Sequence, residues 1–525
     1  MAIKISGTTV INDSRNITDV ENFGNSDTVY TGDGSSLTGI QAGSTTLTAS
    51  GAISNGDPVV INSNGTVSTV ARTGDSKPSA GTPVTFEDGT VTSGGAVAYH
   101  PDSGKFVIAF QDQDDSSKGK ALLATVSGNT ATFSDPVVFH SASTDEYMDI
   151  TYVSDGGKIV ITYVDSAESS RGRAVVGTVS ADGSSISFGP ETTFNNNSTG
   201  SHAICYHAAK KRIMIAFRNS GNNAYGTAIA GEIDGTTISY NSSYQFKSAT
   251  TDKVNIVYEP VAERSVIFFK NNLNRGDACT ADVDPDNYNS ISFGTIYGFN
   301  SSTSHQDTGA AYDSDSGKII IAYKGYSGGN LSRARTVTVS GDTLSFGTAS
   351  EFDTTDNRED VVVYSALENK VLIAYRDGDD SSKGKIVSGT VTGTAITFSS
   401  ETIFEDGAAV KISGDYDTAT GKILLGYKDE DEANDIGKAV VVNTDGRTTN
   451  LTSENYIGIA AAAISDGATG SITIAGGTNT GVTGLSTAKK TFVQRDGTFS
   501  TTADIPSVVA GTSISGTKIV VRTFS

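Results

Sequence analysis

The chain has 525 residues, of which 58 are glycine, 9 are proline and none is tryptophan, and its formal net charge is −21. This charge would repel a duplex or another phosphate-rich surface, which argues against a nucleic-acid partner. No apolar run reaches the roughly 18 residues that a spanning helix needs, so we expect no membrane insertion. Short apolar runs separated by Gly, Ser, Thr, Asp and Asn are typical of many strands joined by tight turns.

Residues 1–44 are polar and punctuated by glycine, with too little apolar content to form a core alone. Such a segment gains order only against copies of itself or against a larger assembly, so we interpret it as an anchoring or oligomerising segment. The opening Met-Ala-Ile-Lys-Ile-Ser-Gly lacks the apolar core of a signal peptide. We therefore expect a soluble protein that is not exported by that route.

Residues 45–81 predict the first part of a small β-domain, because residues 51–68 read as a β-hairpin with an Asn-Gly turn. After this segment the chain changes to a long internal repeat.

A pair of aromatic residues recurs seven times, with a Tyr followed eleven residues later by Phe or Tyr. Successive pairs are 52 to 54 residues apart, which is too short for an independent core and suits one four-stranded blade stacked on its neighbours. We expect both aromatic series to be core residues. The pairs are Tyr99 and Phe110, Tyr152 and Tyr163, Tyr206 and Phe217, Tyr258 and Phe269, Tyr312 and Tyr323, Tyr364 and Tyr375, and Tyr416 and Tyr427.

A third landmark, a Phe, lies 12 or 13 residues before each repeated Tyr. The first of these, Phe86, precedes the first full repeat, whereas the last repeat lacks the Ser-Phe-Gly stretch seen at 187–189 and 345–347. One strand is therefore taken from the other end of the array, and we interpret residues 83–88 as the strand that completes the seventh blade. Because a ring must cover its free strand edge, this offset favours a closed propeller over residues 82–448.

Residues 449–525 carry further short strands in the style of residues 45–81. We interpret residues 45–81 and 449–525 as two parts of one domain, with the propeller inserted between them. Such an insertion is possible because the two ends of a ring meet at one blade. The predicted fold is thus all-β, a seven-bladed β-propeller inserted into a small β-sandwich or barrel domain, with an N-terminal anchoring segment.

Residues 5–18, 32–39, 484–487, 496–502 and 509–512 resemble segments of structural proteins of tailed phages of marine bacteria, especially fibre-type proteins of cyanobacterial phages. The resemblance implies a virion component that is a homotrimer, is anchored through its amino-terminal part to other virion proteins, and is assembled in the host cytoplasm. The propeller is not part of this resemblance.

The sequence does not indicate an enzyme, and we name no catalytic residue, metal ligand or cofactor. It has none of the Ser-x-Asp-x-Gly-x-Thr-Trp turns of sialidase-like propellers, and its five His residues show no nucleophile–base spacing. Its acidic residues recur with the blade period, whereas a catalytic site should break the symmetry. They could ligate calcium, although solvated turns explain them as well. They are Asp112, Asp114 and Asp115, then Asp377, Asp379 and Asp380, and Asp429, Glu430, Asp431 and Glu432.

A basic residue follows the first turn of every repeat. These residues could form a ring of cations that binds an acidic sugar. We favour the alternative, in which each packs its side chain over apolar neighbours at the start of a strand. Cys205 and Cys279 show no pairing pattern and are interpreted as small packing residues. The ligand-binding residues cannot be named, although the irregular loops of the third and fourth repeats are candidates for contact. The basic residues are Lys105, Lys158, Arg212, Arg264, Lys318, Lys370 and Lys422.

Three functions remain open. The first is a virion fibre or spike whose propeller adheres to host surface polysaccharide, with weak sites strengthened by copies on one particle. The second is a capsid- or tail-decorating structural protein without receptor binding. The third is a polysaccharide depolymerase.

Overall fold

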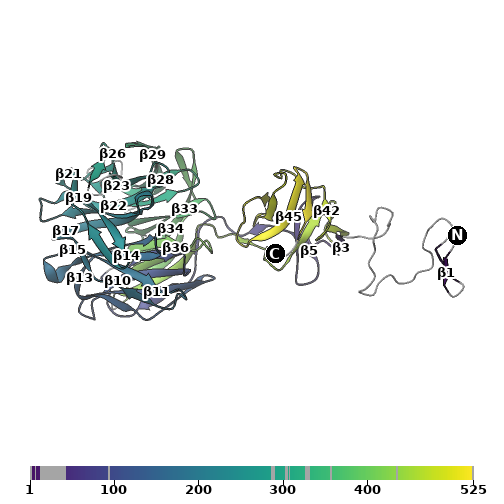
Figure 1. Ribbon diagram of the computed structural model, residues 1–525, viewed down its shortest axis with the longest axis horizontal. Helices are drawn as coiled ribbons and strands as arrows, with labels where there is room; N and C mark the ends of the chain where they lie inside the picture. The colour runs from purple at the N-terminus through teal and green to yellow at the C-terminus, as the bar shows by residue number, and fades with distance from the viewer. Residues whose placement is uncertain are drawn as a thin grey trace.

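The structure is a computed structural model that describes residues 3–5, 8–11, 43–92, 95–284, 290–301, 305–306, 308–325, 331–354, 357–432 and 435–522. Figure 1 shows a larger body of strands from the middle of the chain and a smaller one that combines early and late residues. The described helices are two single 3-10 turns, η1 (Ser166–Glu168) and η2 (Ala208–Lys210). The predicted all-β class is confirmed. None of the described helices is long and apolar enough to cross a membrane.

Each sequence repeat forms a four-stranded antiparallel unit, called a blade below. In the first blade β9 (Ala96–His100) pairs with β10 (Lys105–Asp112), which pairs with β11 (Lys118–Ser127). The outer position is shared by β12 (Thr130–Phe133) and the start of β13 (Val137–Val153), which pair with opposite halves of β11. Strand β13 then continues as the innermost strand of the second blade, so one long strand joins two blades.

The next five blades keep this order from the axis outward. The second blade contains β13, β14 (Lys158–Asp165), β15 (Arg171–Val179), β16 (Ile186–Phe188) and the start of β17 (Thr192–His207), and the third contains the rest of β17, β18 (Arg212–Asn219), β19 (Tyr225–Asp234), β20 (Thr237–Tyr240) and β21 (Tyr244–Thr250). The fourth contains β22 (Asp252–Glu259), β23 (Arg264–Lys270), β24 (Gly276–Val283), β25 (Ile291–Phe293) and β26 (Tyr297–Asn300), and the fifth contains β27 (Thr308–Asp313), β28 (Lys318–Gly325), β29 (Leu331–Ser340), β30 (Thr343–Phe346) and β31 (Ser350–Asp353). The sixth contains β32 (Asn357–Ser365), β33 (Lys370–Asp377), β34 (Lys383–Thr392), β35 (Ala395–Phe398) and the start of β36 (Thr402–Tyr416).

The last blade is completed by strands from upstream of the first. It contains β36, β37 (Ile423–Asp429) and β38 (Ile436–Asn443), and its outer position is filled by β7 (Ser79–Ala80) and β8 (Val84–Glu87). Strand β8 lies at the predicted closing segment, residues 83–88. Strand β7 extends the sheet back to Ser79, three residues before the boundary expected at residue 82.

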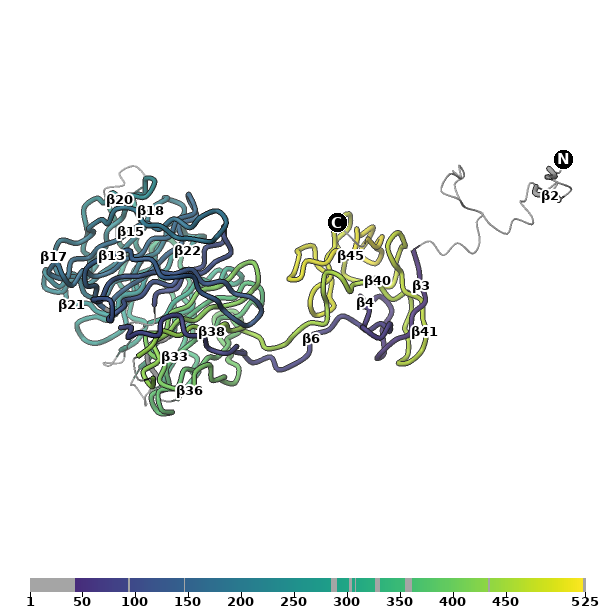
Figure 2. Tube along the Cα trace, turned by 90° about the horizontal axis from the view of Figure 1, so that it is seen from below, coloured from purple at the N-terminus to yellow at the C-terminus, as the bar shows by residue number. Residues whose placement is uncertain are grey.

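The innermost strands pack against one another in chain order, and β36 of the last blade packs against β9 of the first. The tube in Figure 2 shows the early residues running alongside β38 and the late residues. The blades therefore close into a ring around a common axis, which is the arrangement of a β-propeller.

The repeated Phe residues hold neighbouring blades together through one periodic contact. Phe86 of the closing strand lies 5.3 Å from Phe110 between ring centroids. It covers Gly437, where a Cβ would come within 2.5 Å of the ring, as Phe139 covers Gly119. The closing strand thus reproduces the contact of an ordinary blade. The equivalent pairs, 5.1 to 5.4 Å apart, are Phe139–Tyr163, Phe194–Phe217, Phe246–Phe269, Phe299–Tyr323, Phe352–Tyr375 and Phe404–Tyr427.

Substituting one of the covered glycines tests this packing. The Cβ of Gly172→Ala would lie 2.4 Å from the Phe194 ring and 2.8 Å from Thr199 Oγ1. We expect the free energy of unfolding, measured by urea titration, to fall by about 1–3 kcal/mol because a packed core resists added volume. Gly298→Ala is the matched control, since its Cβ meets nothing closer than 3.7 Å. Equal effects of the two changes would contradict the proposed contact.

The small domain is built from both ends of the described chain. One sheet has the order β3 (Ser44–Thr48), β41 (Thr469–Thr473), β40 (Tyr456–Ala460), β4 (Pro58–Ile61) and β5 (Val67–Thr69). The other has the order β42 (Thr478–Asn479), β46 (Lys518–Val521), β45 (Val508–Ser515), β43 (Lys490–Val493) and β44 (Phe499–Ser500). An apolar cluster that includes Val60, Tyr456, Val493 and Ala510 joins the two sheets.

Of the segment expected at residues 1–44, the described part contains the β1 (Ile3–Ile5) and β2 (Thr8–Ile11) hairpin and the start of the small domain. The anchoring role assigned to the rest lies outside the described residues. Between the small domain and the ring, β6 (Arg72–Thr73) pairs with β39 (Thr448–Thr449), so two segments of the chain cross the junction side by side.

Charged side chains fix the junction between the small domain and the ring. Glu368, in the turn between β32 and β33, forms ion pairs with Arg72 at 2.8 Å and with Arg495 at 2.6 Å. Arg495 also donates to the carbonyl oxygen of Leu367 at 2.9 Å. These contacts attach the small domain on the face of the ring that carries the first turn of each blade.

Candidate functional site

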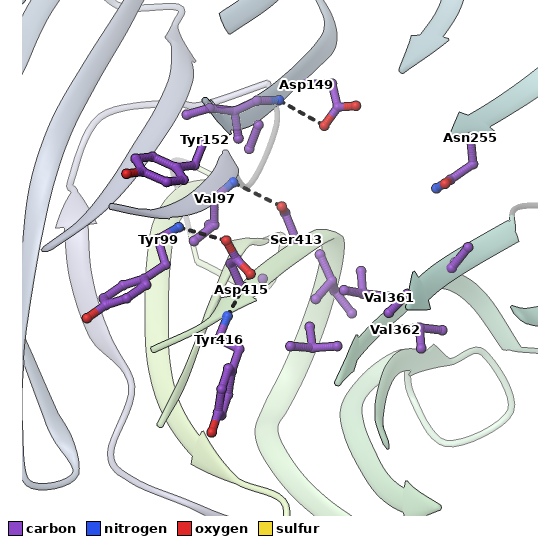
Figure 3. A pocket seen from close by; sticks show the side chains of 18 of the residues that line it. Val97, Tyr99, Asp149, Tyr152, Asn255, Val361, Val362, Ser413, Asp415 and Tyr416 are labelled. Carbon is purple, nitrogen blue, oxygen red and sulfur yellow. Dashed lines mark hydrogen bonds between the residues drawn. The ribbon is translucent and has the colours of Figure 1, made fainter. Parts of the chain in front are cut away.

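A cavity of about 720 Å³ lies on the axis of the ring, and every blade contributes its innermost strand to the wall (Figure 3). It extends from Gly95 and Lys411 at one end of these strands to Pro101 and Thr418 at the other. We call this cavity the central channel. Its volume lies within the roughly 300–1,000 Å³ of typical ligand pockets.

The wall of the central channel consists largely of free strand edges. Strands β9, β22 and β27 each pair on one side only, with β10, β23 and β28. The other edge of such a strand presents its backbone N–H and C=O groups. Apolar side chains, including Val97, Ile150 and Ile204, complete the lining.

Two carboxyl groups lie in this wall. Asp149 on β13 accepts the N–H of Ile204 in the next blade at 2.8 Å, and Asp415 on β36 accepts that of Tyr99 at 2.7 Å. Each also accepts the N–H of the residue that follows it. Both residues are half-buried and line the channel. Burial raises the pKa of each to about 6, although the two N–H bonds oppose the shift.

Other polar side chains continue this pattern between blades. Ser413 Oγ accepts the N–H of Val97 at 3.0 Å, and Asn255 Nδ2 donates to the carbonyl oxygen of Thr308 at 3.1 Å. Asp149, Asn255 and Ser413 occupy the same place, three residues before the repeated Tyr. The wall therefore breaks the sevenfold repeat, because the remaining blades have small or apolar residues there, namely Ala96, Ala203, Gly309 and Val361.

The first aromatic series forms contacts between blades and also lines the channel. The hydroxyl of Tyr152 donates to Asp102 of the preceding blade at 2.9 Å. The hydroxyl of Tyr416 accepts the N–H of Leu367 in the preceding blade at 2.9 Å. Within this series Tyr99 and Tyr416 are buried, as expected for core residues, and the other five tyrosines are half-buried. The second series, with Phe110 and Tyr375 fully buried, is core as expected.

The acidic residues of the second hairpins are engaged within the protein. Asp112 binds Lys120 at 2.6 Å, Asp377 binds Lys385 at 2.8 Å, and Asp429 pairs with Lys438. Asp112 also accepts a backbone N–H of its own loop. Across the described residues no group of three or more His, Cys, Asp or Glu is placed to hold a metal ion. The calcium alternative therefore has no support from the observed contacts.

The basic residues after the first turns bind neighbouring protein groups, which agrees with the packing role that we favour for them. Lys105 donates to Thr125, Lys158 to Thr178, and Lys422 to Asn443.

Both cysteines are free and buried, and burial raises the pKa of each to about 12, so neither is an activated thiol. All five His residues are buried and none lines the described channel wall.

In the irregular third and fourth repeats, Lys211 and Glu263 adopt a φ of 53° in place of the turn glycine. The loop residue Asn271 accepts the N–H groups of Leu273 and Arg275, so it shapes its own loop. The contact role expected for the irregular loops stays a prediction.

Sequence reasoning did not identify the polar residues of the channel. Asp149 and Asp415 precede regular apolar strands, and their partners are supplied by other blades, as Tyr99 lies 316 residues from Asp415. The available signals are exceptions at two repeat positions. Asp149, Asn255 and Ser413 replace small or apolar residues at one, and Asp415 replaces an uncharged residue at the other.

The two channel carboxyls predict an unusual dependence of stability on pH. A carboxyl with a pKa raised from 3.8 to about 6 binds its proton more tightly in the folded chain. Its stabilising contribution is therefore full below about pH 4 and is lost as pH rises to 6. We expect the free-energy difference between the parent and Asp415→Asn to shift against the parent over this interval and to stay constant above it. Urea titrations at pH 4 to 7 measure the difference, and parallel profiles would contradict the expectation.

Comparison with known proteins supports the fold. No protein-family description matches the sequence, and no curated protein matches it. A lectin from Burkholderia pseudomallei matches with a TM-score of 0.52 at 7% identity, over 69% of this chain and 98% of that one. A protein of unknown function from Dyadobacter fermentans (0.41, 11%, 70% and 99%) and a mutant of the Aleuria aurantia lectin (0.37, 12%, 57% and 93%) match at lower TM-scores. The first similarity shows a shared all-β fold.

Proposed function

We propose that this protein is a saccharide-binding adhesin of a phage virion, of fibre or spike type. The observation that carries the binding role is the central channel, whose wall combines carboxylate, amide and hydroxyl groups with apolar side chains. Such a set accepts and donates hydrogen bonds to hydroxyl groups while contacting C–H surfaces. The fold shared with a lectin of Burkholderia pseudomallei agrees with this role.

The virion part of the proposal rests on the resemblance of residues 5–18, 32–39 and 484–512 to phage fibre proteins. In this arrangement residues 1–44 anchor a homotrimer to other virion proteins, and the ring is the receptor-binding part. Light scattering of the full chain tests the trimer, and a monomer would count against the fibre assignment.

Binding of the full-length protein to an array of bacterial envelope polysaccharides tests the adhesin role. Saturable binding to a subset of polysaccharides is expected. A blank array would favour the decorating role, in which the protein bridges other virion components without a receptor.

A depolymerase is the second candidate, because Asp149 and Asp415 place two carboxyl groups with a pKa of about 6 in one cavity. Glycoside hydrolysis uses two carboxyl groups that flank the scissile bond. Each of these side chains is already held by two backbone N–H groups, which favours binding over proton transfer. Release of reducing ends from an array-positive polysaccharide would establish the enzyme.

A further inference from the structure

The two carboxyl groups of the central channel provide more hydrogen-bond acceptors than their observed partners use. A carboxylate has two oxygens and about four lone-pair positions. In Asp149 and in Asp415 each oxygen accepts one backbone N–H, so each retains capacity for another donor. Because both residues are half-buried and line the channel, a molecule in the channel can supply that donor.

These acceptors are concentrated on one arc of the ring. Asp415 and Ser413 belong to the last blade and accept N–H groups of the first, whereas Asp149 belongs to the second blade and accepts one of the third. The innermost strands of the first two blades, with Ala96, Val97 and Ile150, therefore lie between the two carboxyl groups. Figure 3 shows Asp149, Ser413, Asp415 and Val97 around the same space. The arc therefore offers acceptors on both sides of a small apolar surface, which matches a ring with hydroxyl groups at its edge and C–H groups on its faces.

The charge of the arc selects among such ligands. Charges interact more strongly in a cavity lined by protein than in water. Asp149 and Asp415 outnumber Lys411, the one cation that lines the channel among the described residues, so the arc repels an anionic ligand. A bare cation is disfavoured, because the described residues provide no group of three metal-ligating side chains. An uncharged polyhydroxylated molecule fits both the acceptors and the apolar surface.

We infer that the central channel binds the terminal residue of an uncharged saccharide, whose hydroxyl groups donate hydrogen bonds to Asp149 and Asp415. The inference rests on the proposed function and adds to it the site and the class of sugar. It also gives Asp149 and Asp415 a role beyond their contacts between blades.

The first experiment locates the site without any substitution. The full-length protein is labelled at isoleucine methyl groups and titrated with glucose, galactose and mannose, each paired with its uronic acid. Ile150, Ile204 and Ile256 line the channel, whereas Ile519 is buried in the small domain and is the internal control. A neutral sugar should shift the channel methyl signals and leave Ile519 unchanged, and its uronic acid should bind at least about tenfold more weakly.

The second experiment applies Asp149→Asn and Asp415→Asn to the polysaccharide array. Loss of a charged acceptor should weaken binding about 10- to 100-fold. Asp406→Asn is the matched control, since Asp406 is 84% exposed and lies outside the channel wall. Ser413→Ala, which keeps the carboxyl groups, provides a milder change should an Asn variant fail to fold, and it should weaken binding less than tenfold.

The possible results separate the inference from the proposed function. Array binding that is unchanged in the Asn variants, or that is lost on adding EDTA, would overturn the channel site while leaving the adhesin role intact. Preferred binding of the uronic acids would overturn the predicted class of sugar. A blank array together with unshifted channel methyl signals would reject both.

Discussion

Phe86→Ala is expected to lower the free energy of unfolding by about 3–5 kcal/mol, the usual cost of truncating a buried aromatic residue. Phe86 is 9% exposed and packs against Phe110 and Phe133. It is supplied by β8, which reaches the last blade from upstream, so its loss weakens the place where the ring closes. Urea titration measures the stability, and limited proteolysis reports whether the chain is cut near residue 86.

Two further variants show whether the closing strand is docked as firmly as an ordinary one. Phe404→Ala removes the equivalent ring from the sixth blade, where the chain is continuous, and should cost about the same. Thr85→Ala changes an exposed side chain of β8 and should alter stability by less than about 0.5 kcal/mol. A clearly smaller effect of Phe86→Ala than of Phe404→Ala would show that β8 contributes little to closure.

Asp445→Ala is the second change with a large expected effect, a loss of about 3–5 kcal/mol, because it removes one partner of a buried ion-pair cluster. The Asp445 side chain is fully buried and contacts Arg447 at 2.7 Å, Lys370 at 2.9 Å and Arg72 at 3.4 Å. Without it, three cations lie close together at the junction between the small domain and the ring. Calorimetry of the full chain measures the effect.

The pH dependence of this variant provides a second measurement. Burial alone would raise the pKa of Asp445, but hydrogen bonds from Arg447 and Lys370 hold it well below the ordinary value. Its contribution is therefore full above about pH 4 and decreases as pH falls further. The difference between the parent and Asp445→Ala should shrink in acid, whereas exposed Asp75→Ala should show a small difference at every pH. A difference that does not change with pH would contradict the ion-pair account.

The regular features of the fold could be predicted because they repeat. The Tyr and Phe landmarks marked each blade, and the position of Phe86 ahead of the first repeat indicated that β8 completes the last sheet. Strand β7 was not predicted, because Ser79–Ala80 is too short to show any pattern. The virion assignment and the trimer stay predictions, since they rest on a resemblance and on residues outside the described range.

The candidate site could not be predicted in the same way. A repeat shows which positions are equivalent, but it does not show which groups reach the neighbouring blade. Asp149 contacts Ile204, 55 residues away, and Ser413 contacts Val97, 316 residues away. These pairs depend on the curvature and closure of the ring, which a linear pattern does not contain. The sequence shows only that Asp149, Asn255, Ser413 and Asp415 are polar exceptions at their repeat positions.

The two segments that connect the small domain to the ring, paired through β6 and β39, determine how a pulling force is transmitted through the protein. The two connecting segments continue into neighbouring strands of one blade, because β7 pairs with β38 at Ala80 and Val442. A force that pulls the small domain away from the ring therefore draws β7 and β38 in the same direction. Neighbouring strands that are drawn together do not slide past each other, so their hydrogen bonds are not sheared apart. Tension between the small domain and the ring would thus stretch the connecting segments before it opened the ring.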